Sequence, residues 1–524
     1  MKSIKYIAIL SFVLLAINAC TDDFEEINTN PNSQVVGSNE GLLLGAQIRA
    51  SRELLDNINS FNKGMSKWTQ YYTNNLQPSE FISSNTRSDF NDFWVYQNLV
   101  TQTIPLVERI IDNTEETPHP NFKAIALVLK GWIYGNMTEL WGPIPFSDAQ
   151  YGEISEEEQY NKPKFDSQEE ILKGVIGLLE EANNTFDLSG ESGVVIKPES
   201  DAFGGGDILK WKKFANSLQV RILMRISDAD PSFAKAKLEE IFANPSKYPV
   251  LESNADNFGM TWEDAVGSYP DPFASYVENN DERAPIVITG FLNTLGDLED
   301  PRMKVLVSPA EGYTDEETYV GLPPAFDDEN PSDFTRMALD SVSQLSPEFT
   351  SVQQRPIMTY AELLLIKAEA EAKNINVGTS AEAAYQAGIA AHMEELGVST
   401  ADIDTYLSSS DVVYDASKAT EQIITQRYIA QFGQSINTFS MIRRTGYPTM
   451  DFFDIGIHKE KGYPVRMRYP IETMLNFNKE NYENAIAGVS IIDNVFGDNL
   501  WFAKNAPTVG MEPNLQTAPV LYQY

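Results

Sequence analysis

Aromatic side chains flanked by polar residues form three clusters in this sequence, and such clusters supply the chemistry of ligand recognition. The first begins at Trp68, the second surrounds Trp262, and the third comprises Tyr313, Tyr319 and Phe326. A sugar or peptide site needs flat apolar faces for stacking and polar groups at its rim, although packing in the core is the alternative for any single aromatic residue. The first two clusters provide the candidate ligand-binding residues Trp68, Tyr71, Tyr72, Phe81, Arg87, Trp262, Tyr269 and Tyr276.

Carboxylates supply the chemistry of a different class, the glycoside hydrolases, in which two suitably separated acids cleave the glycosidic bond. Acidic groups occur at 297–300 and 327–329, but 75 acidic residues produce such groups by chance. No HExxH, GxSxG or P-loop lysine pattern occurs, and the histidines, at 119, 392 and 458, are too scattered to define a zinc site. We therefore expect no enzyme activity and no cofactor. A structural calcium ion would suit the oxygens of Asp327, Asp328, Glu329 and Asp333, although their spacing is not that of an EF-hand.

Two arginine pairs and one glycine-rich segment have alternative interpretations. Arg443 with Arg444, or Arg466 with Arg468, could bind an anionic ligand, because a guanidinium fork suits a carboxylate. The alternative, which we favour, is a buried pairing with Glu362 or Glu472 inside the scaffold. The segment 203–207 could bind an anion through its backbone N–H groups. The interpretation that we favour is a flexible entry to a helix, with Asp207 as the N-cap.

The first nineteen residues have the pattern of an export signal. Lys2 and Lys5 precede an apolar run, 7–17, that is too short to span a bilayer, and Ala19 stands before Cys20. A cysteine directly after the small residue indicates lipoprotein processing. We therefore expect removal of 1–19, lipidation of Cys20, a polar tether over 20–40, and a folded domain over 41–524.

Charge and cysteine content limit the partners and the means of stabilisation. The net charge of −36 argues against nucleic acids and anionic membrane surfaces as partners. Contact with a membrane is therefore expected through the lipid anchor only. Because Cys20 is the only cysteine, the fold contains no internal disulfide and depends on its packed core.

The elements that must position these groups are predominantly helical. Capping signals occur at Ser167 with Glu170, at Asp230-Pro231, at Thr359 with Glu362 and at Thr379 with Glu382. The last two open a helical hairpin of tetratricopeptide size. We predict one all-α domain of tetratricopeptide-like helical hairpins. Its helices are separated by long irregular loops at 70–92, 187–207, 252–283, 307–335 and 445–470.

Six segments along the chain carry a resemblance to a known family. They are FEEINTNPN (24–32), LWGPIPFSD (140–148), the segment 210–225 with Lys210-Trp211 and FANSL, MTYAELLLIKAEA (358–370), RRTGYP (443–448) and RYPIE (468–472). In this order they resemble the SusD/RagB family of outer-membrane nutrient-binding lipoproteins, in particular its SusD-like branch with an RRTGYP motif. Two departures, Phe439 and Phe502 at positions where tryptophan is common, look like substitutions in the core.

The resemblance implies a fold, a partner and a location. The fold would be a right-handed array of tetratricopeptide-like hairpins with ligand-binding loops on one face. The partner would be a SusC-like TonB-dependent outer-membrane transporter, and the protein would be lipid-anchored in the outer membrane, facing the cell exterior. Its ligand would be a nutrient oligomer, an oligosaccharide or a peptide, bound without catalysis. A surface glycoside hydrolase and a repeat scaffold that binds only proteins remain as alternatives.

Overall fold

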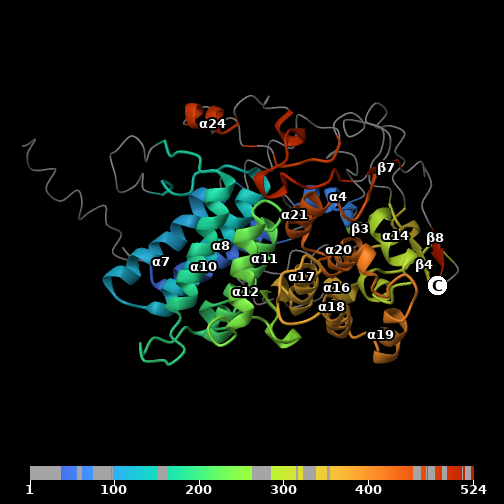
Figure 1. Cartoon of the computed structure of the whole chain (residues 1–524), viewed down its shortest axis with the longest axis horizontal. Coiled ribbons are helices and arrows are strands. Elements are labelled where there is room, and N and C mark those ends of the chain that lie inside the picture. The colour runs from blue at the N-terminus through green and yellow to red at the C-terminus, as the bar shows by residue number, and fades with distance from the viewer. Residues whose placement is uncertain are drawn as a thin grey trace, which may run out of the picture.

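A computed structural model gives the structure of the chain (Figure 1). The residues it describes, to which the following statements refer, are 37–55, 62–74, 96, 98–150, 162–262, 285–313, 317–322, 338–350, 354–452, 462–467, 469, 478–486, 493–509, 511–513 and 521–523.

The helices between residues 39 and 243, except α4 (Asn62–Trp68), lie side by side as a bundle, which is blue to green in Figure 1. Helix α8 (Pro120–Trp141) is buried along almost its whole length between α7 and α10. Its sequence is apolar on nearly all sides, as expected of a helix that is surrounded by others. The other helices of this bundle are α3 (Asn39–Leu54), α7 (Ile104–Glu116), α10 (Gln168–Thr185), α11 (Ile208–Ile226) and α12 (Pro231–Ala243).

The predicted helical hairpin is formed by α17 (Tyr360–Ala372) and α18 (Ala381–Glu395) in the second half of the chain. At Gly388 an added Cβ would lie 2.7 Å from Leu365 Cγ and 3.3 Å from the Ala361 carbonyl oxygen, so the two helices approach closely there. The hairpin packs on α20 (Ala419–Ala430) and, through α17, on α11 of the first bundle. The remaining α-helices are α4 (Asn62–Trp68), α14 (Thr289–Asp297), α15 (Met303–Leu306), α16 (Pro347–Thr350), α19 (Thr400–Leu407), α21 (Ser435–Thr445) and α24 (Lys479–Ala485).

Short helices of other types complete the helical elements. They are the π-helix η2 (Leu99–Thr103) and the 3-10 helices η4 (Pro198–Ser200), η5 (Asn254–Asp256), η7 (Leu339–Ser341), η8 (Ala416–Lys418), η9 (Asp493–Phe496) and η10 (Trp501–Ala503).

Most predicted helix starts are confirmed. Ser167 and Glu170 form a reciprocal capping box at α10, and Asp230 caps α12 with Pro231 in its first turn. Thr359 caps α17, but the Glu362 carboxylate points into the core instead of returning to the cap. The prediction of Thr379 as a cap is wrong by one residue. The Ser380 hydroxyl accepts the N–H of Ala383 and begins α18.

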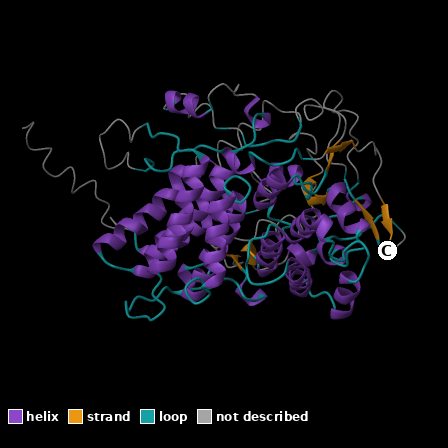
Figure 2. Ribbon diagram, viewed as in Figure 1, coloured by secondary structure: helices purple, strands orange, loops and turns teal. Residues whose placement is uncertain are grey.

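Short strands lie beside and between the helices (Figure 2). In the described residues they form four two-stranded pairs, β1–β3, β2–β5, β4–β8 and β6–β7. The sequence does not predict these strands, because three to five residues do not establish an alternating pattern. Their bounds are β1 Tyr72–Asn74, β2 Phe258–Thr261, β3 Pro285–Val287, β4 Thr318–Val320, β5 Gln354–Met358, β6 Met450–Phe452, β7 Met511–Pro513 and β8 Leu521–Gln523.

One continuous apolar core connects the two halves of the chain. Its buried side chains run from Leu43 in α3 to Val509 near the C-terminus, and a second cluster fills the space between α17, α18 and α20. Helix α3 begins at Asn39, inside the predicted tether, because Ser38 accepts the N–H of Gly41 and caps it. Cys20 and the predicted signal lie outside the described residues, so the division at 19 and 40 stays a prediction.

Candidate ligand-binding site

Two of the predicted loops meet at one small pair of strands. Asn74, the last residue of β1, pairs with Pro285, the first residue of β3, in antiparallel register. The segment 75–95 therefore leaves, and the segment 263–284 arrives, at the same end of this pair. The candidate residues Phe81, Arg87, Tyr269 and Tyr276 belong to these two segments and lie outside the described residues.

Further backbone hydrogen bonds build a larger unit around β3. The Val287 N–H donates to the Ser343 carbonyl oxygen at 3.0 Å, and the Ser343 N–H donates to the Val320 carbonyl oxygen at 2.8 Å. We call residues 72–74, 285–288, 307–313, 317–322 and 338–345 the β3 unit. Its apolar interior consists of Ile286, Ala310, Val320, Leu322 and Val342. The unit gives loops that are distant in sequence a common base.

The first aromatic cluster adjoins this unit, which includes Tyr72, and is buried. The Tyr71 hydroxyl donates to the Tyr428 carbonyl oxygen at 2.6 Å, and the two rings stack with centroids 4.8 Å apart. Trp68 packs against Phe439 at 5.1 Å, and Tyr72 is only 2% exposed. These contacts give Trp68, Tyr71 and Tyr72 a packing role in the structure, while ligand contact by them stays a prediction.

Trp262, the centre of the second cluster, lies at the end of β2 and is 8% exposed. The third cluster differs, because Tyr319 is buried whereas Tyr313 is 36% exposed. Within the described part of the chain, Tyr313 is the only exposed aromatic residue of the three clusters. It belongs to the β3 unit, where the neighbouring Gly312 N–H donates to the Asp340 carbonyl oxygen. Among the described residues of the three clusters, Tyr313 is therefore the aromatic residue most accessible to a ligand.

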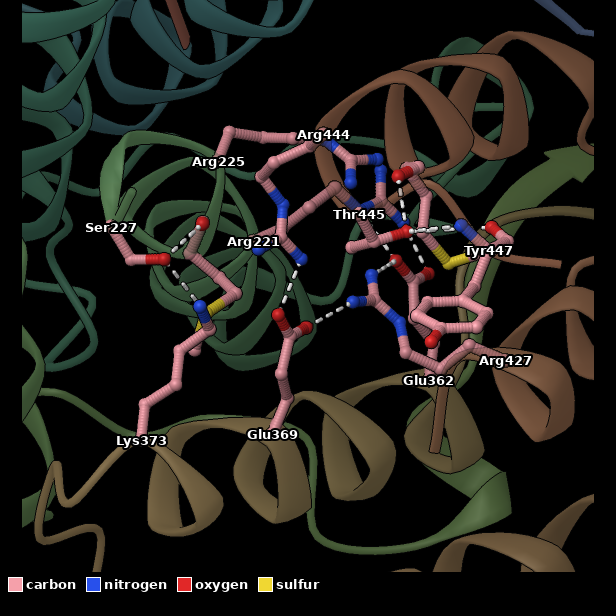
Figure 3. A network of polar contacts seen from close by, with 12 residues as sticks. Arg221, Arg225, Ser227, Glu362, Glu369, Lys373, Arg427, Arg444, Thr445 and Tyr447 are labelled. Carbon is pink, nitrogen blue, oxygen red and sulfur yellow. Dashed lines mark hydrogen bonds and ion pairs between the residues drawn. The ribbon is translucent and has the colours of Figure 1, made fainter. Parts of the chain in front are cut away.

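The arginines of the RRTGYP motif are buried and paired within the protein (Figure 3). Arg444 Nη2 donates to Glu369 Oε1 at 2.6 Å, and Arg444 Nη1 donates to Asp228 Oδ2 at 2.8 Å. Arg443 has different partners, the carbonyl oxygens of Phe439 and Val465. The favoured interpretation of a buried pairing with a carboxylate therefore holds for Arg444, although its partner is neither Glu362 nor Glu472. Arg466 donates to the Asp498 carbonyl oxygen, and Arg468 lies outside the described residues.

Glu362 and Glu369 lie about two turns apart in α17 and connect four helices through arginines. Glu362 Oε1 accepts Arg221 Nε from α11 at 2.8 Å, while Arg427 Nη1 from α20 donates to Glu369 Oε2 at 2.9 Å. Burial raises the pKa of the Glu369 carboxyl, but Arg444 and Arg427 outweigh burial and hold that pKa below its ordinary value. We call Arg221, Glu362, Glu369, Arg427, Arg444 and Asp228 the ionic lattice.

The glycine-rich segment 203–207 holds a carboxylate of the protein itself. Asp201 Oδ1 accepts the Gly204 N–H at 3.0 Å, and its Oδ2 accepts the Gly206 N–H at 2.9 Å and Trp211 Nε1 at 2.8 Å. Asp207 caps α11 by accepting the Lys210 N–H, as favoured from the sequence. The cradle is therefore filled and takes no external anion.

Two of the groups considered for catalysis, Asp300 and His392, have structural partners. Asp300 and Arg302 form a buried pair with Asp300 Oδ1 2.9 Å from Arg302 Nε, and His392 Nδ1 lies 3.1 Å from Arg302 Nη1. Burial, aided by Arg302, lowers the pKa of His392 well below its ordinary value, so the imidazole stays uncharged. Among the described residues no group of three or more His, Cys, Asp or Glu side chains is arranged to hold a metal ion. The carboxylates considered for calcium lie outside that set.

Helical hairpins that carry loops on a small β unit define the class of this chain as a tetratricopeptide-like scaffold. Residues 32–470 match the model of the SusD-like family, described as "Starch-binding associating with outer membrane". The chain belongs to this family, as the resemblance of its motifs indicated. No helix in the described ranges is both long and apolar enough to cross a bilayer.

Solved structures agree with this assignment. A chitin-binding protein shares 26% identity, with 89% of this chain and 99% of its own covered and a TM-score of 0.73. A chitin-binding SusD homolog from Flavobacterium johnsoniae shares 20% identity over 90% of this chain and 100% of its own, with a TM-score of 0.74. A SusD homolog from Bacteroides vulgatus shares 20% identity over 90% of this chain and 98% of its own, with a TM-score of 0.73. None of the curated proteins compared with the chain matches it. The predicted all-α, tetratricopeptide-like fold is confirmed.

Proposed function

We propose that this protein binds nutrient oligosaccharides at the outer membrane and passes them, unchanged, to a SusC-like TonB-dependent transporter. The match of residues 32–470 to a family of starch-binding, outer-membrane-associated proteins carries this proposal. Two similar structures that are named chitin-binding favour a glycan over a peptide, and among glycans they favour chitin fragments.

The loops attached to the β3 unit are the proposed binding site. The bases of segments 75–95 and 263–284 adjoin at the Asn74–Pro285 pair, and Tyr313 presents an exposed ring on the same unit. A sugar ring stacks on such a face through its C–H groups, while polar loop residues accept and donate hydrogen bonds. The rings of Trp68 and Trp262 are buried, and contact of either with the ligand remains part of the proposal.

Replacing Tyr313 with alanine is expected to weaken oligosaccharide binding about tenfold, which corresponds to about 1.4 kcal/mol, because a stacking face is lost. Calorimetry on residues 21–524 with chitohexaose and maltohexaose measures this change. Tyr414→Ala, a half-buried tyrosine beside Tyr385 in the hairpin, is the control and should bind as the wild type does.

Three outcomes would replace the proposal with one of its alternatives. Binding of peptides but of neither sugar would make the ligand a peptide. Shortened sugars after incubation would establish a glycoside hydrolase, and binding of neither ligand class would leave a protein-binding scaffold.

We also propose that lipidated Cys20 anchors the protein in the outer membrane, on its outer face. The apolar run before Cys20 and the acidic segment that follows it support this assignment. Each acyl CH₂ buried in the bilayer contributes about 0.8 kcal/mol, so several chains retain the protein at the membrane. Cys20→Ser is expected to move the protein to the soluble fraction. The variant is therefore expected to lose its co-purification with a TonB-dependent barrel from detergent extracts. A serine variant that stays in the membrane fraction would contradict the anchor.

A further inference from the structure

A cavity of about 460 Å³ opens beside the RRTGYP motif. It lies where the ends of α17 and α21 meet the first turn of α20, and it shares no residue with the β3 unit. The position of the cavity follows from the way the RRTGYP motif ends α21. Gly446 ends α21 in a left-handed conformation, φ 76°, and the turn directs Tyr447 to the cavity wall.

The floor of this cavity is part of the ionic lattice and is fixed in place. Asp228 bridges Arg444 at 2.8 Å and Lys373 at 2.5 Å, and the guanidinium of Arg444 is held from behind by Glu369. Asn505 Nδ2 donates to the Asp228 carbonyl oxygen at 2.7 Å, which leaves its amide oxygen as an acceptor. Because these groups are already ordered, a ligand would lose little free energy in arranging them.

The rim offers polar groups without such partners. Lys418 occupies the N-cap position of α20 without a capping side-chain hydrogen bond, and it precedes the exposed residues Thr420 and Glu421. In the described parts of the chain neither Lys418 nor Glu421 makes an ion pair. The rim therefore supplies one ammonium group, one carboxylate and one hydroxyl that are available to a ligand.

Charge and shape together specify the chemistry of an occupant. The lining contains three cationic side chains and three anionic ones, namely Lys373, Lys418, Arg444, Asp228, Glu369 and Glu421. This balance favours neither an anion nor a cation, but it surrounds the cavity with both donors and acceptors. The half-buried ring of Tyr447 adds an apolar face. A neutral polyhydroxylated ring has matching features, since its hydroxyls both donate and accept and its C–H groups contact an aromatic ring.

We propose that this cavity is a second, separate sugar subsite that binds one neutral monosaccharide ring. The volume is near the lower end of the range for small-molecule pockets, about 300–1,000 Å³, and therefore suits a single ring. The assignment uses only the residues of the cavity and does not require the loops of the β3 unit to bind oligosaccharides. A single ring makes few contacts, so the dissociation constant is expected on the order of 1 mM.

Blocking the cavity without breaking the lattice tests this proposal. Ala372 is exposed, lines the cavity at the end of α17 and makes no side-chain hydrogen bond, so Ala372→Trp fills the space and leaves the ion pairs intact. The matched control is Ala383→Trp, an equally exposed alanine of α18 that does not line the cavity. Saturation-transfer NMR on residues 21–524 with glucose, N-acetylglucosamine and glucuronate gives the readout.

The expected result is binding of a neutral monosaccharide by the wild type, by Ala383→Trp and by Tyr313→Ala, with affinity at least about tenfold lower in Ala372→Trp. Undiminished binding by Ala372→Trp, tighter binding of glucuronate than of the neutral sugars, or no monosaccharide binding would each overturn the proposal. Binding of hexasaccharides by Ala372→Trp reports separately on the loop site, so failure of one site is distinguishable from failure of the other.

Discussion

Replacing Glu369 with alanine is expected to lower the free energy of unfolding by about 3–5 kcal/mol, the range observed when one partner of a buried ion pair is removed. Glu369 is 1% exposed and accepts hydrogen bonds from two buried guanidinium groups, those of Arg427 and Arg444. Without it, Arg427 keeps only a 3.7 Å contact with Glu362. The loss is large because water cannot reach the uncompensated charges that remain. Denaturant titration followed by circular dichroism measures the change.

Two further variants separate the ionic effect from the loss of a side chain. Glu394→Ala removes an exposed carboxylate from α18 and should change stability by less than about 0.5 kcal/mol. Changing Arg427 and Arg444 to methionine in the Glu369→Ala background removes the uncompensated charges and should restore part of the stability. A Glu369→Ala variant as stable as the Glu394→Ala control would show that the lattice contributes no net stability.

Helix ends could be predicted from the sequence because capping is local. The Ser167–Glu170 box depends on four consecutive residues, and the structure contains it as predicted. The error at Thr379 has a local cause too, since Ser380 beside it is an equally good N-cap residue. The family motifs extended these local predictions to the whole fold. Six segments in a fixed order identify an architecture, whereas helix propensities identify only single elements.

Contacts between distant segments could not be predicted in the same way. Arg444 was expected to pair inside the scaffold, but its partner Asp228 lies 216 residues away, at the turn between α11 and α12. Nothing in the local sequence distinguishes Asp228 from the other acidic residues. The cavity beside it depends on the same long-range contacts, so its lining residues Lys373 and Asn505 had no signal in the sequence.

The aromatic residues show a different limit. Trp68 and Tyr71 precede a polar loop, as ligand-binding residues often do, yet α4 packs on α21 and carries both into the core. Tyr313 has a similar polar environment in sequence but remains exposed on the β3 unit. Which ring is covered depends on packing between segments hundreds of residues apart, and the side-chain type does not reveal it.

The ionic lattice also predicts a loss of stability in acid. Burial raises the pKa of the Glu362 carboxyl, but Arg221 beside it and Arg427 beyond outweigh burial and hold that pKa below its ordinary value. The pKa of Asp228 is lowered in the same way, with burial opposed by Arg444 and Lys373. In the unfolded chain a glutamate titrates near its ordinary value of about 4.3. Below that pH the unfolded chain takes up protons that the folded chain does not, so the free energy of unfolding falls as the pH falls.

Glu362→Gln isolates the part of this acid effect that comes from the lattice. Each carboxyl protonated only in the unfolded state contributes a slope of up to about 1.4 kcal/mol per pH unit. Below about pH 4.3 the wild type should therefore lose stability more steeply than Glu362→Gln, by up to that amount, although the variant is the less stable protein at neutral pH. Denaturant midpoints between roughly pH 7 and pH 3 give both slopes, and groups that titrate in both proteins cancel from the comparison. Parallel curves would mean that Glu362 takes up its proton equally in the folded and unfolded chains, and that Arg221 does not hold it ionised.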